Sequence, residues 1–68
     1  MNMVDAQNYL MALATDYAVN ITGGPVEGGY YSEIHVGGPV MFSTTCSTLA
    51  ELTTAVHIWL DDANASIN

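Results

Sequence analysis

The side chains of this chain that are suited to metal or acid–base chemistry are few and spread along the sequence. His57 and Asp61 stand four residues apart, so they share one face if that segment is helical, and Asp62 follows directly. A zinc site needs three or four ligands of this kind. Glu33 or His35 would have to supply the third, and no spacing in the sequence requires that they meet the first pair. We therefore expect a solvated helix face here and no metal site.

Nucleophilic and other catalytic roles find little support. Cys46 is the single cysteine, so the chain forms no internal disulfide. A reactive thiol needs a neighbouring cation or base, and the chain has no Lys or Arg, so we expect Cys46 to be a small buried or half-buried hydrophobic residue. Catalysis on anionic substrates needs cationic groups, and paired-carboxylate catalysis needs one acid in an apolar pocket. We predict that the protein is not an enzyme and uses no cofactor.

The charge balance is the most informative property of the composition. There are no Lys or Arg residues and seven acids, which give a formal net charge of −7. The acids are Asp5, Asp16, Glu27, Glu33, Glu51, Asp61 and Asp62. With no internal cation to offset them, their field is reduced only by salt or by a partner. The surface should repel nucleic acid and anionic membranes and attract a basic protein. The tyrosines and Trp59 could stack on bases, but single-strand binding also needs a basic groove.

The N-terminal third predicts a helix followed by an ambiguous segment. Apolar residues recur at steps of three and four over residues 3–17, and Asp5 lies where a helix N-terminus favours negative charge. Residues 17–22 alternate between apolar and polar types, which predicts either a short strand or a continuation of the helix to Asn20. Residues 23–29 contain four glycines and Pro25 and predict a loop. Its spacing fits neither a dinucleotide-binding nor a P-loop pattern, and no Lys follows.

The middle of the chain predicts a hairpin. Residues 30–36 alternate, with one face made of Tyr30, Ser32, Ile34 and Val36 and the other of Tyr31, Glu33 and His35. Residues 37–39 form a Gly-Gly-Pro turn, and residues 40–45 return as the second strand. We expect Tyr31 to be the aromatic residue that contacts a partner, because it lies beside Glu33 and His35 on the outer face.

A second helix is predicted from Thr48. Thr48 and Glu51 have the capping-box spacing, in which each side chain satisfies one free backbone amide at a helix start. The apolar stripe that follows consists of Leu49, Leu52, Val56, Trp59, Leu60 and Ala63. Thr53 lies off this stripe. The stripe indicates a helix that ends near Asn64, followed by a frayed tail over residues 64–68.

Together these elements predict an α+β fold in which two helices pack on a small antiparallel sheet. The order is α-(β)-β-β-α, with a hairpin or three strands, in a single domain of residues 1–68. A core this small is marginal and is compatible with a homodimer. No segment reaches the roughly 18 apolar residues of a membrane span. A secretory signal needs basic residues that are absent, so we expect a cytoplasmic protein with no membrane partner.

The carboxylates that lie off the apolar faces are the candidate partner-binding residues. The predicted contact set is Glu27, Tyr31, Glu33, Glu51, Asp61 and Asp62. Solubility alone can be achieved with both acidic and basic residues on the surface. The absence of every Lys and Arg increases the repulsion among the acids, which a binding function would explain. The expected function is therefore electrostatic binding of a basic protein surface, without direct contact to nucleic acid.

One family resemblance concerns the length, the acidic composition and the order of elements of the chain. A short acidic protein with helix, hairpin and helix, and with Trp59-Leu60-Asp61-Asp62 near its end, resembles the small acidic phage-encoded anti-CRISPR proteins, some of which imitate DNA. This resemblance implies an inhibitor that occupies the basic DNA-binding surface of a CRISPR effector (Cas) complex in the bacterial host cell.

A second resemblance rests on two segments. Residues 28–34, Gly-Gly-Tyr-Tyr-Ser-Glu-Ile, and residues 48–52, Thr-Leu-Ala-Glu-Leu, resemble HicB-type antitoxins in their strand-and-helix order. The chain departs from that family in having only Gly-Gly-Pro at residues 37–39, a leading helix and no DNA-binding tail. The alternative function that it implies is neutralisation of a basic ribonuclease toxin.

Overall fold

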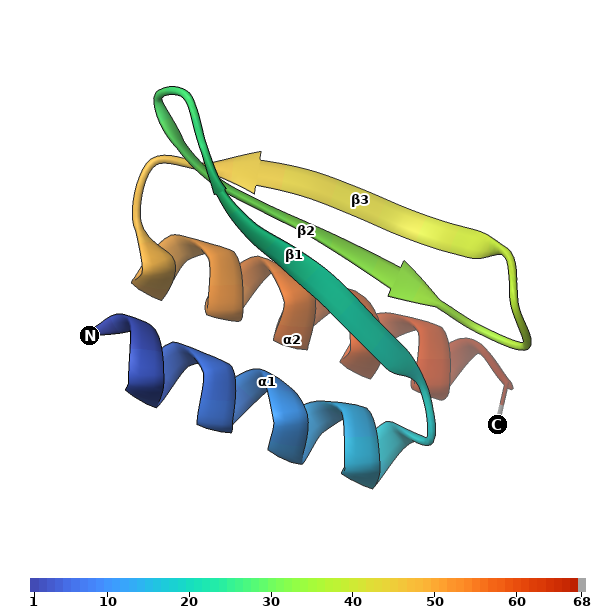
Figure 1. Cartoon of the computed structure of the whole chain (residues 1–68). Helices are drawn as coiled ribbons and strands as arrows, with labels where there is room; N and C mark the ends of the chain where they lie inside the picture. Colours follow the sequence, from blue (N-terminus) through green and yellow to red (C-terminus); the bar gives the residue numbers. More distant parts are fainter. Residues whose placement is uncertain (68) are drawn as a thin grey trace.

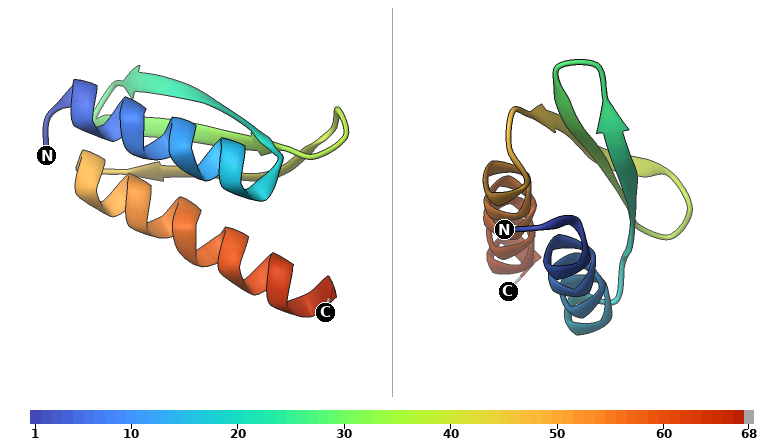
Figure 2. Two further views of the ribbon diagram at one scale, coloured as in Figure 1. Left: turned by 90° about the horizontal axis from the view of Figure 1, so that it is seen from below. Right: turned by 60° about the vertical axis from the view of Figure 1, so that its left-hand side comes forward.

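A computed structural model describes residues 1–67, with side chains described as far as residue 65. The elements are α1 (Met3–Tyr17), β1 (Asn20–Val26), β2 (Gly29–His35), β3 (Val40–Cys46) and α2 (Leu49–Ile67). The strands form one antiparallel sheet in the order β1-β2-β3. Both helices cover the same face of this sheet, lie side by side and run in the same direction (Figures 1 and 2). The fold is α+β, as predicted, and the third strand is present.

Both helices begin with a side-chain cap. The Asn2 side chain accepts a hydrogen bond from the backbone N–H of Asp5 at 2.8 Å. The Thr48 hydroxyl accepts one from the N–H of Glu51 at 3.1 Å. This confirms the threonine half of the predicted capping box; the reciprocal bond from the Glu51 side chain is not among the hydrogen bonds of the described residues. These caps satisfy amide groups that have no partner inside the helix.

The C-terminal end of α1 settles the ambiguity at residues 17–22. Ala18 adopts a left-handed conformation, with φ of 56°. The backbone N–H groups of Ala18 and the next residue bond to the carbonyl groups of Thr15 and Ala14, at 3.4 and 3.0 Å. This pairing is the Schellman motif, which ends a helix. The helix therefore stops at Tyr17, and the alternative in which it continues to Asn20 is wrong.

The predicted loop over residues 23–29 is largely a strand. Gly23 pairs with Ser32 and Val26 with Gly29, so β1 runs through the glycine–proline segment and the turn is confined to residues 27 and 28. Pro25 is tolerated because β1 is an edge strand, whose outer side needs no N–H donor. The local rules that predicted a loop were overridden by pairing with β2.

Gly23 is required by close packing inside the sheet. Its φ is 150°, and a Cβ atom at this position would lie 2.0 Å from the backbone oxygen of Tyr31. A side chain here would push β1 away from β2. The glycine that predicted a loop therefore holds two strands together.

The hairpin of β2 and β3 is confirmed, with a local irregularity. Ser32 and Ile34 are buried against the helices, which fits the predicted inner face. The pairing shifts between Ile34 and His35, where β3 carries Met41 as an extra residue, so the two strands form a β-bulge. Val36 was predicted to continue the inner face, but it lies beyond β2 and is exposed.

The core lies between the helices and the covered face of the sheet. Its buried residues are Leu13, Ile34, Val56 and Leu60. The rings of Phe42 and Trp59 stack beside it at a centroid distance of 5.3 Å. These contacts join both helices to the central strand and β3.

The second helix differs from its prediction in two places. Thr53 is buried, although it was placed off the apolar stripe; its hydroxyl donates to the carbonyl of Ala50 at 3.0 Å, which satisfies it inside the helix. The helix continues to Ile67, past its predicted end at Asn64, so the expected frayed tail is helical as far as it is described. Asn68 lies outside the described residues. Among those residues, no helix has the length and apolar character needed to cross a membrane.

Candidate functional site

Three of the predicted partner-binding residues lie on the sheet side of the molecule. Tyr31 and Glu33 alternate with buried residues of β2 and face away from the helices, as predicted. Glu27 lies exposed in the turn between β1 and β2, beyond the end of the sheet. Figure 1 shows this turn at the opposite end of the molecule from the C-terminal part of α2.

The other three lie on α2, on the helix side. Glu51 is in the first turn, and Asp61 and Asp62 come ten residues later, about 15 Å further along the helix axis. The structure therefore does not bring the six predicted residues together. It divides them among the open sheet face, the two ends of α2 and one turn.

The open sheet face carries a small polar cluster. The Tyr31 hydroxyl donates to Glu33 Oε2 at 2.7 Å, and His35 Nε2 lies 3.5 Å from Glu33 Oε1. Thr22 of β1 places its hydroxyl 3.4 Å from the same His35 nitrogen. His35 Nδ1 lies 3.3 Å from the Gly38 carbonyl, to which it can donate. A neutral His35 thus accepts from Thr22, and only a protonated one forms an ion pair with Glu33.

A second cluster joins the two helices. The Tyr9 hydroxyl of α1 and Nδ1 of His57 on α2 lie 2.7 Å apart and form a hydrogen bond between the helices. His57 Nε2 lies 3.6 Å from Asp61 Oδ2, which confirms that these residues share a face. The Tyr17 hydroxyl donates to the other oxygen, Oδ1, of Asp61. Asp61 therefore links the C-terminal end of α1 to α2.

Negative charge is concentrated around this link. Asp16 lies in the last turn of α1, Asp61 contacts Tyr17, and Asp62 follows on the exposed side of α2; we call these three residues the acidic end. The hydrogen bond to Asp61 raises the pKa of Tyr17 above 10.0, assisted by desolvation and by the charges of Asp61 and Asp16. Helix C-terminal carbonyls also disfavour nearby acids. Asp16, in the last turn of α1, is thus an acid that opposes folding, whereas Asp61 is held by Tyr17.

Acids at the other ends of the helices have a structural role. Asp5 and Glu51 lie in the first turns of α1 and α2, beside the free N–H groups. Negative charge is favourable there, typically by 0.3–1 kcal/mol. Glu51, predicted as a contact residue, therefore has a structural role at the start of α2.

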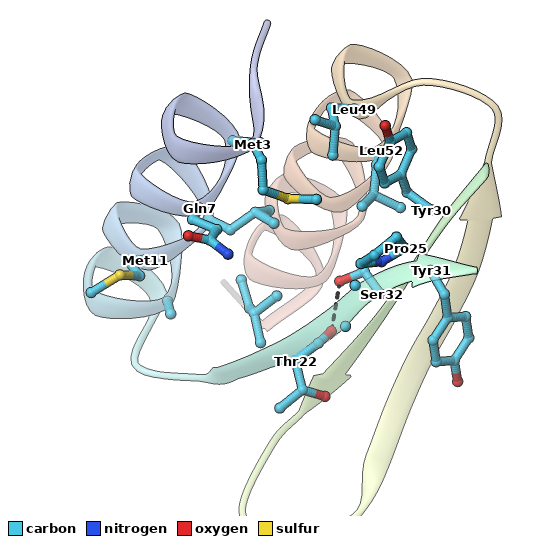
Figure 3. Close-up of a pocket in the computed structure, with 16 residues that line it drawn as sticks. Met3, Gln7, Met11, Thr22, Pro25, Tyr30, Tyr31, Ser32, Leu49 and Leu52 are labelled. Carbon is cyan, nitrogen blue, oxygen red and sulfur yellow. Dashed lines mark hydrogen bonds between the residues drawn. The ribbon is translucent and has the colours of Figure 1, made fainter.

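A largely apolar pocket opens between α1, β1 and the first turns of α2, with a volume of about 500 Å³ (Figure 3). Met3, Leu49 and Leu52 contribute apolar walls, and Pro25 and Tyr30 close the sheet side. Among the described residues that line it, none carries a charge. The pocket is suited to an apolar group and offers nothing that would bind an ion.

Metal and nucleophilic chemistry gain no support from the geometry. Glu33 and His35 lie on the open sheet face, whereas His57 and Asp61 lie on the helix side, so the third ligand considered above does not reach the first pair. Residues 1–67 contain no group of three potential metal ligands. Cys46 is half-buried at the end of β3, in line with a packing role.

Several residues of these clusters were not among the predicted site residues. Asp16, Tyr9 and Tyr17 come from α1, and the partners of the two tyrosines are more than forty residues away in the chain. No local spacing links such distant positions. The signal that could have found Asp16 is its place just before the end of the predicted helix, where an acid is unfavourable.

The chain matches no protein-family model, and neither a curated protein nor a solved structure is significantly similar to it. The two family resemblances stated from the sequence thus stay predictions.

Proposed function

We propose that this protein is an inhibitor that binds a basic, nucleic-acid-handling protein through its acidic end and blocks the DNA-binding surface of that protein. The observation that supports this most is the position of Asp16 and Asp61 around the C-terminal end of α1. Asp16 weakens the end of α1, Asp61 adds a second negative charge beside it, and the chain has no Lys or Arg to offset them. A basic partner would supply the missing positive charge.

The physical basis of such binding is electrostatic steering. The carboxylates of a chain without Lys or Arg attract a lysine- and arginine-lined surface at long range and can raise association rates by about 10- to 1,000-fold. The same surface would compete with the phosphates of DNA for those cations. More specifically, we propose that the chain is a DNA-mimicking anti-CRISPR protein whose target is a CRISPR effector complex in the bacterial cytoplasm.

Competition with target DNA tests the proposal. The protein is titrated into a purified effector complex with fluorescent target DNA, and the concentration that prevents DNA binding is measured at several salt concentrations. We expect inhibition to weaken steeply as salt rises, because screening removes the attraction. Inhibition that is independent of salt, or absent with every effector type, would contradict the proposal.

Two charge-matched variants locate the contact. Asp61→Asn with Asp62→Asn should weaken inhibition by about tenfold or more, equivalent to about 1.4 kcal/mol. Glu27→Gln with Glu51→Gln removes the same charge at the other end of the molecule and should change inhibition by less than about threefold. If both double variants lost the same amount of inhibition, net charge would explain binding and the position of the charge at the acidic end would not. Circular dichroism confirms that both variants fold.

A second candidate is an antitoxin of the HicB type. The structure has β2 over residues 29–35 and a helix from Leu49, which is the strand-and-helix order on which that resemblance rests. The discriminating observation is biological. An antitoxin would restore growth to cells that express a basic ribonuclease toxin, whereas an anti-CRISPR protein would protect a phage from a CRISPR-bearing host.

A further inference from the structure

The two edges of the sheet differ in their protection against pairing with another strand. The β1 edge contains Gly23, Gly24 and Pro25, and Pro25 has no N–H to offer. The β3 edge, Val40–Cys46, contains no glycine, no proline and no charged residue. Natural sheets usually protect a free edge with prolines, charges or a covering element. An unprotected edge of this kind favours strand pairing.

The regular part of the β3 edge is residues 42–46. The bulge at Met41 twists the strand near the turn, but from Phe42 to Cys46 each residue of β3 has one partner on β2. Within the described residues β3 pairs with β2 alone, so its outer side is open. Ser43 and Thr45 are exposed on the face without helices, and Met41 is 56% exposed beside them.

The distribution of acids indicates what can approach this edge. Strand β3 itself contains no Asp or Glu, and the acid opposite Ser43 on β2 is Glu33, which accepts a hydrogen bond from Tyr31. Two copies of the chain, each with a net charge of −7, repel each other wherever their acids meet. A basic partner is drawn to the carboxylates and away from this edge. The uncharged edge therefore fits a second copy of the chain best.

We propose that β3 pairs antiparallel with β3 of a second copy about a two-fold axis, which makes one continuous sheet across a homodimer. Backbone hydrogen bonds supply the attraction, as in other strand-addition complexes, and the two-fold axis closes the assembly. Both helix pairs then cover the same face of the joined sheet. The acidic ends lie on the helix side and stay available, so this inference is independent of the proposed inhibitory function.

Sedimentation velocity of the purified protein alone, over a range of protein and salt concentrations, tests the dimer. Because repulsion between the copies is screened, the dimer should become tighter as NaCl rises from about 0.05 M to about 1 M. This is the reverse of the salt response expected for inhibition, so the two proposals can fail separately. A monomer at every concentration and salt would overturn the dimer.

A matched pair of variants locates the interface. Thr45→Glu adds a like charge on each side of the paired edge and should weaken the dimer at least about tenfold. Asn20→Glu adds the same charge on β1, at the opposite edge, and should leave a dimer of nearly unchanged affinity. Equal effects of the two variants would overturn the assignment to β3.

Hydrogen exchange supplies a test that requires no substitution. Backbone amides of residues 42–46 that point outward should exchange more slowly as the concentration of the unmodified protein rises, because pairing protects them. Amides on the outer side of β1 serve as the internal control and should not respond. Protection that grows at β1 in place of β3 would contradict the inference.

Discussion

At the N-terminal ends of the two helices, Asp5 and Glu51 lie in the first turns beside side-chain caps, whereas Asp16 and Asp61 surround the C-terminal end of α1. Asp5 and Glu51 stabilise the helix starts, whereas Asp16 opposes the end of α1. Packing differs as well, since the pocket opens at the N-terminal end and the buried core continues toward the other. Comparison of the ends separates acids explained by folding from acids that need another explanation.

The largest expected difference between the two ends lies in packing. Leu60 belongs to the central core cluster, whereas Leu52, although also buried, borders the pocket. We expect Leu60→Ala to lower the free energy of unfolding by about 3 kcal/mol and Leu52→Ala by about 2 kcal/mol. Urea denaturation at fixed salt measures both. A larger loss at Leu52 would mean that the pocket is filled in solution.

The C-terminal end of α1 can be improved at Ala18. Its left-handed conformation strains a residue that has a Cβ atom, whereas glycine adopts this conformation freely. After the extra entropy of an unfolded glycine is subtracted, Ala18→Gly should raise the free energy of unfolding by about 0.5 kcal/mol. Thermal denaturation checks the sign. Ala12→Gly, at an exposed helical position, is the control and should be destabilising by about 1 kcal/mol.

Neutralisation of single acids should have opposite signs at the two ends. Asp5→Asn removes a favourable charge from a helix start and should lower the free energy of unfolding by about 0.5 kcal/mol. Asp16→Asn removes an unfavourable charge and should raise it by a similar amount. The difference should shrink in high salt. If both substitutions lowered the free energy of unfolding by the same amount, the distinction between the favourable Asp5 and the unfavourable Asp16 would be contradicted.

The smallest expected effect is a titration shift at the acidic end. Asp61 raises the pKa of Tyr17 above 10.0, so the neutral phenol is favoured in the folded state. The resulting stability is present below the unfolded pKa and is lost as pH rises through the higher folded value. Asp61→Asn should return the pKa of Tyr17 toward 10.0, as followed by NMR. The pKa of Tyr31, raised by its hydrogen bond to Glu33, should not respond.

Local patterns predicted those parts of the fold whose contacts are local. The capped start at Thr48, the turn at residues 37–39 and the alternating faces of β2 depend on neighbours in the sequence, and all three are present. The course of β1 could not be predicted in this way. Its Gly-Gly-Pro segment is extended because Gly23 packs against Tyr31 across the sheet, a contact that no local rule contains.

The candidate site likewise contains some contacts that local spacing predicts and others that it does not. The pairing of His57 with Asp61 follows from helical spacing, and the contact of Tyr31 with Glu33 follows from strand alternation. The role of α1 was missed because the three strands separate the helices in the sequence, and Tyr9 and Tyr17 reach their partners only when the fold brings α2 beside α1. In the sequence, Asp16 is one acid among seven, and only its position near Tyr17 and Asp61 in the fold distinguishes it from the others.

The placement of α1 beside α2 has a consequence for biosynthesis. Helix α1 is made before α2, yet its contacts with His57 and Asp61 require that later helix. While the ribosome is still adding α2, the apolar side of α1 and the inner face of the sheet have no cover. Final packing must therefore wait until α2 has been translated, and a nascent chain that lacks α2 would be a substrate for chaperones.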